Sequence, residues 1–328
     1  MQNHNITIER YNADSASVWD DFVDKSKNGT FLFKRAYMDY HADRFEDFSL
    51  MIYSSHSEPK ARNLLAILPA NKAEKTLYSH QGLTYGSLLV TTEISQGLML
   101  AIFDALKAFL KPLGFEKIYY KTIPAIYHKL PCEEDLYALF RHNAKLVVRN
   151  CSTTFDIQKS KTASKYRLRV SNAAEKHNLR YEIHGNVDAF WPIVEEKLNQ
   201  KHGVLPVHSQ AEINLLQTSL PQNIQGIAVF SDDKIVAGAV VYLANDVAHL
   251  QYAAVSPEGE KMGAGEFLYD SLIHKLYPEF RYFDFGISTE KGGHFLNEGL
   301  IFYKEKFGGS TIVYDHYEIE ISSAESVM

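Results

Sequence analysis

The sequence feature that most constrains the fold is an order of elements that occurs twice. Residues 83–122 read as strand, helix and strand, and residues 250–287 read as the same order. Apolar residues recur at helical spacing in the two middle segments, over 94–110 and 265–276, and the exit strands alternate aromatic and polar residues. Strand–helix–strand units of this length favour a sheet covered by helices. We therefore interpret the two segments as diverged copies of one domain.

The remaining patterns agree with two domains of mixed α+β or α/β class. The 328 residues suffice for two ordinary cores, and a hydrophobic fraction of 45% with 23% charged residues is typical of globular proteins. Two strand-like runs flank the turn-forming residues 231–234, which predicts an antiparallel hairpin. Ser209 and Glu212 match a capping box that opens a helix. We expect domains over 1–150 and 151–328, each with a mixed, mostly antiparallel sheet flanked by helices.

Composition excludes several classes of function. A formal net charge of −6 argues against a DNA-binding protein. Cys132 and Cys151 are the two cysteines, and neither has a partner at metal-ligand spacing, so no metal site or disulfide framework is predicted. The polar N-terminus differs from a signal peptide, and no apolar stretch approaches the roughly 20 residues that cross a bilayer. The expected location is the cytoplasm, with no membrane span.

A glycine-bearing segment, 256–265, lies between a predicted strand and a predicted helix. Glycines allow close approach of a ligand to the backbone, and a helix start adds unpaired N–H donors and the positive end of its dipole. These features suit a pyrophosphate. Taken alone, the segment fits a tight turn better, because short motifs of this kind have many false positives.

A second segment, 297–309, joins the first in a resemblance. Together they resemble the GNAT superfamily of acyltransferases, whose pyrophosphate loop has the form Gln/Arg-x-x-Gly-x-Gly/Ala. That loop aligns on Glu260, Gly263 and Gly265, and a later Asn…Tyr-x-x-x-Gly pattern aligns on Asn297 and Tyr303. The chain departs from the family at Glu260, which is acidic where Gln or Arg is usual. This departure either weakens phosphate binding or leaves Lys261 to supply the neutralising charge instead.

Within that superfamily the chain looks more like the Fem group, two-copy GNAT proteins related to the peptidoglycan-bridge aminoacyltransferases. The resemblance rests on Gly299-Leu300-x-x-x-Lys304-x-x-Phe307-Gly308-Gly309. The long helical arm of the bridge-forming enzymes is missing, which disfavours tRNA as a partner. Residues 124–128 and 133–141 look like acetyltransferase-like proteins of bacterial surface-polysaccharide clusters.

The resemblance implies two tandem GNAT-like domains that transfer an acyl group to an amine. Acetyl-CoA or another acyl-CoA would be the donor, and an amino sugar of a surface polysaccharide or cell-wall precursor would be the acceptor. Tyr303 aligns with the tyrosine that protonates the leaving thiolate, and Lys304 with a lysine near the aminoacyl ester. An amide of the strand 247–255 would polarise the donor carbonyl. The expected donor-binding residues are Lys261, Met262, Gly263, Ala264, Gly265 and Asn297.

Each of these residues also has a structural interpretation. Tyr303 could pack on a helix face, and Lys304 could be a solvated surface lysine. His249 and Gln251 would share one strand face by their period of two, so one of them could contact substrate. Asp284 lies among strand aromatics and is either a satisfied, partly buried carboxylate, which we favour, or a site residue.

Two further segments bear on partners. Residues 159–180 hold seven basic side chains and one acid, which favours a solvated amphipathic helix; an anion site for a nucleotide-sugar, a lipid phosphate or tRNA is the alternative. The first copy has Thr91-Thr92-Glu93 in place of the glycine loop. We expect that copy to be degenerate and to serve the acceptor side at the domain boundary.

Three functions therefore remain open. The leading hypothesis is an N-acyltransferase that uses acyl-CoA. The second is an aminoacyl-tRNA-dependent transferase of the Fem kind. The third is a GNAT-like scaffold that binds a ligand without catalysis, a possibility that Glu260 supports.

Overall fold

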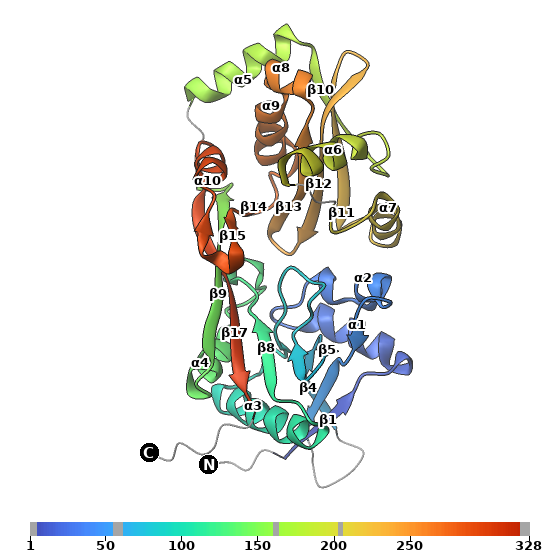
Figure 1. The fold of residues 1–328 in the computed structure, drawn as a ribbon, viewed down its shortest axis with the longest axis vertical. Coiled ribbons are helices and arrows are strands. Elements are labelled where there is room, and N and C mark those ends of the chain that lie inside the picture. The colour runs from blue at the N-terminus through green and yellow to red at the C-terminus, as the bar shows by residue number, and fades with distance from the viewer. Residues whose placement is uncertain (1–4, 55–61, 160–163, 203–205, 322–328) are drawn as a thin grey trace. The chain divides into compact units, whose positions relative to one another are not determined.

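A computed structural model describes residues 5–54, 62–159, 164–202 and 206–321. The chain forms two units, which are described one at a time (Figure 1). The first comprises the described residues up to 150, together with 291–294 and those from 313 on, and the second comprises 151–290 and 295–312.

The first unit is built from two groups of strands and a long helix. One group has the order β1-β3-β4-β7, and the other has the order β17-β8-β6-β5-β2. Only the β6–β8 pair among the pairs recorded here is parallel. The elements are β1 (Ile6–Arg10), α1 (Ala16–Lys25), α2 (Arg35–Met38), β2 (Glu46–Asp47), β3 (Leu50–Ser54), β4 (Asn63–Leu68), β5 (Asn71–Ala73), β6 (Thr76–Tyr78), β7 (Leu89–Val90), α3 (Gln96–Leu110), β8 (Lys117–Lys121), α4 (Glu134–Arg141) and part of β17 (Ser310–Glu320).

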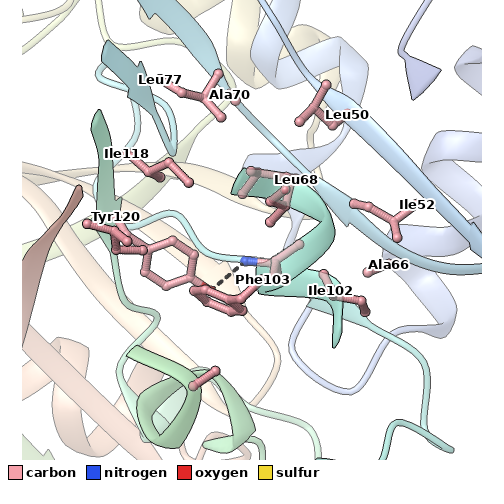
Figure 2. Packing of buried hydrophobic residues seen from close by; sticks show 14 of the residues in the cluster. Leu50, Ile52, Ala66, Leu68, Ala70, Leu77, Ile102, Phe103, Ile118 and Tyr120 are labelled. Atoms are coloured by element: carbon pink, nitrogen blue, oxygen red, sulfur yellow. Dashed lines mark hydrogen bonds between the residues drawn. The ribbon is translucent and has the colours of Figure 1, made fainter. Parts of the chain in front are cut away.

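Helix α3 forms the core of the first unit with these strands. The Ser95 side chain accepts a hydrogen bond from the Leu98 N–H and so caps the helix start. The helix then buries five apolar side chains on one face: Met99, Ile102, Phe103, Leu106 and Leu110. Figure 2 shows Ile102 and Phe103 packed with strand residues that include Leu50, Ile52, Ala66, Leu68, Ile118 and Tyr120. The predicted helix is confirmed, but only Leu89–Val90 of the predicted first strand is paired.

The second unit is a sheet in the order β10-β11-β12-β13-β14-β9, antiparallel except for the parallel β13–β14 pair. Helix α5 packs against α9, and α6 packs against β12 and β13 (Figure 1). The elements are part of β9 (Lys145–Asp156), α5 (Ser164–Lys176), β10 (Leu179–His184), α6 (Trp191–His202), α7 (Gln210–Ser219), β11 (Ile224–Ser231), β12 (Lys234–Ala244), β13 (Val247–Val255), α8 (Pro257–Met262), α9 (Ala264–Ser271), the π-helix η6 (Leu272–Leu276), β14 (Tyr282–Ile287), β15 (Thr289–Glu290), β16 (Phe295–Leu296) and α10 (Glu298–Glu305).

Two predictions for the second unit that depend on residues a few positions apart are confirmed. The β11–β12 hairpin turns through Asp232, whose φ of 53° suits a short polar side chain. Ser209 and Glu212 form the predicted capping box at the start of α7. The expected fold class, a mostly antiparallel mixed sheet flanked by helices, is confirmed.

The extent of the second unit differs from the expected 151–328. Residues 316–320 of β17 pair with β8, so the described residues from 313 on belong to the first unit. This strand pairs with a partner about two hundred residues earlier in the sequence, as in His316 with Lys121. Such long-range pairing leaves no local sequence signal.

Candidate active site

A pocket of about 570 Å³ lies in the second unit beside strand β13. Strand β13 and helices α6, α9 and α10 supply most of its walls. Its lining residues are Lys197, Leu198, Ala253, Ala254, Val255, Glu260, Gly265, Glu266, Tyr269, Asn297, Gly299, Leu300 and Tyr303. The pocket is of the size that small-molecule sites have in proteins, and its wall mixes apolar side chains with a few polar ones.

The strands beside the pocket diverge. Strands β13 and β14 pair in parallel from Val247 with Tyr282 as far as His249 with Asp284, and the pairing ends there. On its other side β13 has a bulge, because Val241 pairs with Leu250 and Val240 with Tyr252, which leaves one residue extra. A bulge re-aims side chains and breaks the ladder of main-chain hydrogen bonds. Main-chain groups of β13 past His249 are therefore not paired with β14.

Tyr303 of α10 lies at the wall of the pocket next to the start of α9. A methyl group on Gly265 would lie 3.3 Å from the Tyr303 hydroxyl oxygen and 3.2 Å from Cγ2 of Val255. The Tyr303 ring meets those of Tyr269 and Phe307 edge to face, with centroids 5.9 and 5.6 Å away. Burial, followed by Tyr269 and Glu266, raises the pKa of Tyr303 far above its usual value. The phenol is thus protonated at neutral pH and can donate a proton.

The glycine segment has more regular structure than the sequence predicted. Lys261 and Met262 belong to helix α8, and Gly263 joins α8 to α9 with a φ of 74°. The Gly263 N–H already donates to the Glu260 carbonyl, 3.3 Å away. The expected row of ligand-binding amides is therefore shorter than predicted. A helix leaves its first N–H groups without intrahelical acceptors, and in α9 these begin at Ala264 and Gly265.

Glu260 forms an ion pair at the wall of the pocket. Its carboxylate pairs with Lys197 of α6, and both side chains line the pocket. Lys261 is exposed and lies outside the lining. The role of Lys261 in donor binding stays a prediction.

Asn297 and Lys304 both stabilise helix α10. The Asn297 side chain caps the helix by accepting from the Leu300 N–H at 3.1 Å, and it also lines the pocket. Lys304 is 7% exposed, and its Nζ donates to the carbonyls of Gly286 and Ile287 at 2.7 and 2.9 Å. The interpretation of Lys304 as a solvated surface lysine is therefore wrong. Two of its donors join α10 to the end of β14.

His249 and Gln251 both lie outside the pocket lining, and the extra residue of the bulge interrupts the regular alternation of strand faces between them. His249 is 8% exposed, and its Nδ1 lies 3.0 Å from Oδ2 of Asp284. Gln251 is the bulged residue, and its buried Oε1 has no hydrogen-bond partner within the described part of the chain. Asp284 is fully buried and satisfied, whereas partial burial was expected.

Several lining residues were missed at the sequence level. Tyr269 follows Gly265 by four positions, so helical spacing alone could have placed it on the same face. Burial, followed by Glu266, raises the pKa of Tyr269 to about 12. Lys197 and Leu198 come from α6, and no local motif connects them with the pocket. Residues 164–176 of the basic segment form helix α5 with Val170 buried, which agrees with an amphipathic helix, whereas residues 160–163 lie outside the described part of the chain.

Within residues 5–54, 62–159, 164–202 and 206–321, no group of three His, Cys, Asp or Glu side chains is placed to hold a metal ion. In the same residues, no helix combines the length and apolar character needed to cross a membrane.

Comparison with known protein families gives one match. Residues 160–304 match the family described as "Acetyltransferase (GNAT) domain". The match covers α5 through most of α10, and so includes the whole pocket lining. No curated protein matches the chain.

Solved structures resemble the chain over almost its whole length. FemX covers 94% of this chain and 96% of its own, with a TM-score of 0.65 and 11% identity. L-PGS from Bacillus licheniformis covers 96% and 94%, with a TM-score of 0.61 and 14% identity. A tandem GNAT protein from the clavulanic acid biosynthesis pathway covers 98% and 100%, with a TM-score of 0.53 and 10% identity. These likenesses concern the fold.

Proposed function

We propose that this chain, whose residues 160–304 match a GNAT acetyltransferase domain, transfers an acyl group from acyl-CoA to an amine. The observation that carries the proposal is the pocket where β13 and β14 diverge, with the Tyr303 hydroxyl at its wall. Main-chain groups that leave a sheet at such a point can bind the donor, and a phenol beside them can protonate its leaving group.

We assign donor binding and proton donation to different residues of the pocket. The first-turn N–H groups of α9, at Ala264 and Gly265, would bind the donor pyrophosphate with the positive end of the helix dipole. A main-chain amide near the Gln251 bulge would polarise the thioester carbonyl. Tyr303 would then give its proton to the departing thiolate. Its raised pKa suits that role, because the phenol remains protonated until the thiolate forms.

The acceptor we propose is an amine, such as an amino sugar of a surface polysaccharide or cell-wall precursor. Lys304 would act by position, since its bonds to the carbonyls of Gly286 and Ile287 hold α10 and Tyr303 against the sheet. Acyl-CoA is a cytoplasmic donor, so we place the reaction in the cytoplasm. The acceptor-side role of the first domain stays a prediction.

A second candidate function is transfer of an aminoacyl group, as in the peptidoglycan-bridge enzymes that the Fem segment resembles. The observation that favours it is the acidity of the pocket. Glu266 lines the wall in addition to Glu260, and Lys197 pairs with Glu260. A carboxylate complements the ammonium group of an aminoacyl donor better than the phosphates of CoA.

Ligand-dependent stability separates the candidates. A ligand that binds only the native state stabilises it by about 2.7 kcal/mol at a concentration of 100 times its Kd. We expect acetyl-CoA to raise the melting temperature of the protein and charged tRNA not to do so. Stabilisation by charged tRNA alone, weakening steeply with salt, would select the aminoacyl candidate. No response to either would reject both.

Substitutions at two glycines test whether acetyl-CoA binds in this pocket, and one of them is the control. Gly265→Val places a side chain against Tyr303 and Val255 and should abolish the stabilisation by acetyl-CoA. Gly185→Val adds the same side chain in the second unit where nothing lies within 4 Å, so its response to acetyl-CoA should equal that of the wild type. Equal responses in both variants would place the donor outside this pocket.

A further inference from the structure

A second cavity of the same unit lies between helices α5 and α9, and we call it the α5–α9 cavity. Its volume is about 420 Å³, which is within the range of small-molecule sites. Its lining shares no residue with that of the pocket beside Tyr303. Phe267 and Asp270 of α9 contribute to the wall. The lining residues of α5 include four that share one helix face by their spacing: Arg167, Val170, Ser171 and Ala174.

A buried carboxylate in the wall of this cavity lacks a hydrogen bond. The Asp270 side chain is 7% exposed, and its Oδ1 has no hydrogen-bond partner among the residues that the structure describes. Arg167 Nε and His274 Nε2 lie 3.5 and 3.9 Å from that oxygen, so they form ion pairs that are too long for good hydrogen bonds. Burying a charge without hydrogen bonds is unfavourable. A ligand that donates to Asp270 Oδ1 would remove this cost.

The α5–α9 cavity carries charges of both signs. Arg167 and Lys275 contribute exposed cations, and Asp270 and Glu175 contribute carboxylates. A fully ionised anion would leave Asp270 without a donor, and a simple cation would be repelled by Arg167 and Lys275. A ligand with one charge of each sign satisfies both sets. It therefore has to be a zwitterion.

The spacing of the charges limits how far apart the two groups of the ligand can be. Arg167 Nε is 3.5 Å from Asp270 Oδ1, so the ammonium and carboxylate groups of a ligand that contacts both must lie close together. In an α-amino acid the two groups are bonded to the same carbon. The remaining lining is apolar apart from Ser171, which favours an aliphatic side chain: Leu168, Val170, Ala174 and Phe267.

We propose that the α5–α9 cavity is a binding site for a free α-amino acid with an aliphatic side chain, such as leucine. The ammonium group donates to Asp270 Oδ1, and the carboxylate accepts from Arg167 and Lys275. Arg167 belongs to the basic segment 159–180, so this site gives part of that segment a role in binding. The site is separate from the proposed acyl transfer and does not depend on it.

The first test is ligand-dependent melting of the full chain at neutral pH. L-Leucine should raise the melting temperature, because it binds the native state alone. Leucinamide keeps only the ammonium group and 4-methylpentanoate keeps only the carboxylate, so each should bind on the order of 10-fold more weakly. The isomer 6-aminohexanoate carries its two charges at opposite ends of the chain and should also bind more weakly.

Two arginines of α5 provide a matched pair of variants. Arg167→Gln removes the cation beside Asp270 and should raise the Kd of leucine on the order of 10-fold, measured by titration calorimetry. Arg169→Gln removes the same charge two positions away, where the guanidinium lies over the Tyr166 ring and outside the lining. Its Kd should equal that of the wild type. Asp270→Asn should abolish binding, and Arg167→Gln keeps the test valid if the Asp270 variant does not fold.

A variant of the other pocket shows which cavity the amino acid occupies. Gly265→Val places a side chain against Tyr303 and Val255, so it fills the wall of the candidate active site. Leucine bound in the α5–α9 cavity should stabilise this variant as much as the wild type. Loss of that response would place leucine in the candidate active site and overturn the inference.

Three further results would also overturn it. The first is an unchanged melting temperature with millimolar leucine, which is expected of a cavity that holds only water. The second is equal stabilisation by leucine and by its two analogues with a single charge. The third is an equal rise of Kd in Arg167→Gln and Arg169→Gln. The response to acetyl-CoA is measured separately, so none of these results decides the proposed acyl transfer.

Discussion

Both units contain a strand, a helix and a second strand in the same order. The space between the two strands differs from one unit to the other. In the first unit β7 pairs with β4 and β8 pairs with β6 and β17. The Tyr120 hydroxyl of β8 bridges to the chain before β7 by accepting from the Leu88 N–H at 2.9 Å (Figure 2). In the second unit β13 and β14 pair and then separate beside a pocket. The space between the strands holds the Tyr120 hydroxyl in the first unit, whereas in the second unit it lies beside a cavity.

Each unit also buries a carboxylate near its gap, with different partners. Asp135 in the first unit accepts from the hydroxyls of Ser87 and Tyr120 at 2.7 and 2.9 Å. Burial raises the pKa of Asp135, although these hydrogen bonds act to lower it. Asp284 in the second unit instead holds an imidazole that remains partly exposed. Equivalent burial thus gives the two carboxylates different partners, hydroxyl side chains in one unit and an imidazole as well in the other.

The largest expected difference is in acid stability. Burial lowers the pKa of His80 from 6.5 to about 3 and that of His316 to about 4, both in the first unit. A depressed folded pKa contributes stability above the unfolded value, which is lost as pH falls toward the folded one. For His80 this loss amounts to about 5 kcal/mol between pH 6.5 and 3. The first unit should therefore unfold at a higher pH than the second.

Each unit holds one of the two tryptophans, so fluorescence can follow the units separately. Trp19 and Trp191 are both fully buried. The Trp191→Phe protein reports on the first unit and the Trp19→Phe protein on the second. Acid titration of both should give different midpoints, and His80→Gln should bring them closer. Coincident midpoints in the parent proteins would contradict the prediction.

The next effect in size concerns the tyrosine beside the pocket. Tyr303→Phe should lower turnover with acetyl-CoA about 100-fold, equivalent to about 2.7 kcal/mol, because the leaving thiolate loses its proton donor. Thermal stabilisation by CoA should not change, since the ring remains in place. Steady-state kinetics and melting curves measure the two quantities. Unchanged turnover would remove Tyr303 from the mechanism.

A buried tyrosine of the first unit, Tyr120, should affect stability instead of turnover. Tyr120→Phe removes the acceptor of the buried Leu88 N–H and a donor to Asp135. Leaving such groups unsatisfied costs about 1–3 kcal/mol each. We expect urea unfolding at a lower concentration, with a wild-type turnover per folded molecule. A fall in turnover without loss of stability would break the contrast between the units.

The smallest expected effect tests the glycine at the strand opening. Gly286→Ala introduces no close contact but forces a Cβ-bearing residue to a φ of 74°, which costs about 1–2 kcal/mol. Gly97→Ala in α3, where nothing lies within 4 Å, should instead raise stability by up to about 1 kcal/mol. Melting temperatures of the two variants should move in opposite directions. A stabilised Gly286→Ala would show that β14 does not need this conformation.

The sequence by itself determined the features that depend on neighbours within a few positions. Periodicity predicted α3 and the β11–β12 hairpin, and the capping box predicted the start of α7. Three residues in the segments singled out by the resemblance line the same pocket, namely Gly265, Asn297 and Tyr303. The chemical roles of these residues stay predictions. Elements of this kind depend on residue spacing and on helix caps, so they can be predicted without knowledge of the fold.

Only the tertiary structure decided which distant side chains meet. The pairs His249–Asp284, Ser152–Asp284 and Lys197–Glu260 join residues 35, 132 and 63 positions apart. Their contacts depend on strand register, on one bulged residue and on the turn of a helix. A shift of one residue in register moves a side chain to the other face of a sheet, so no local pattern could have predicted them.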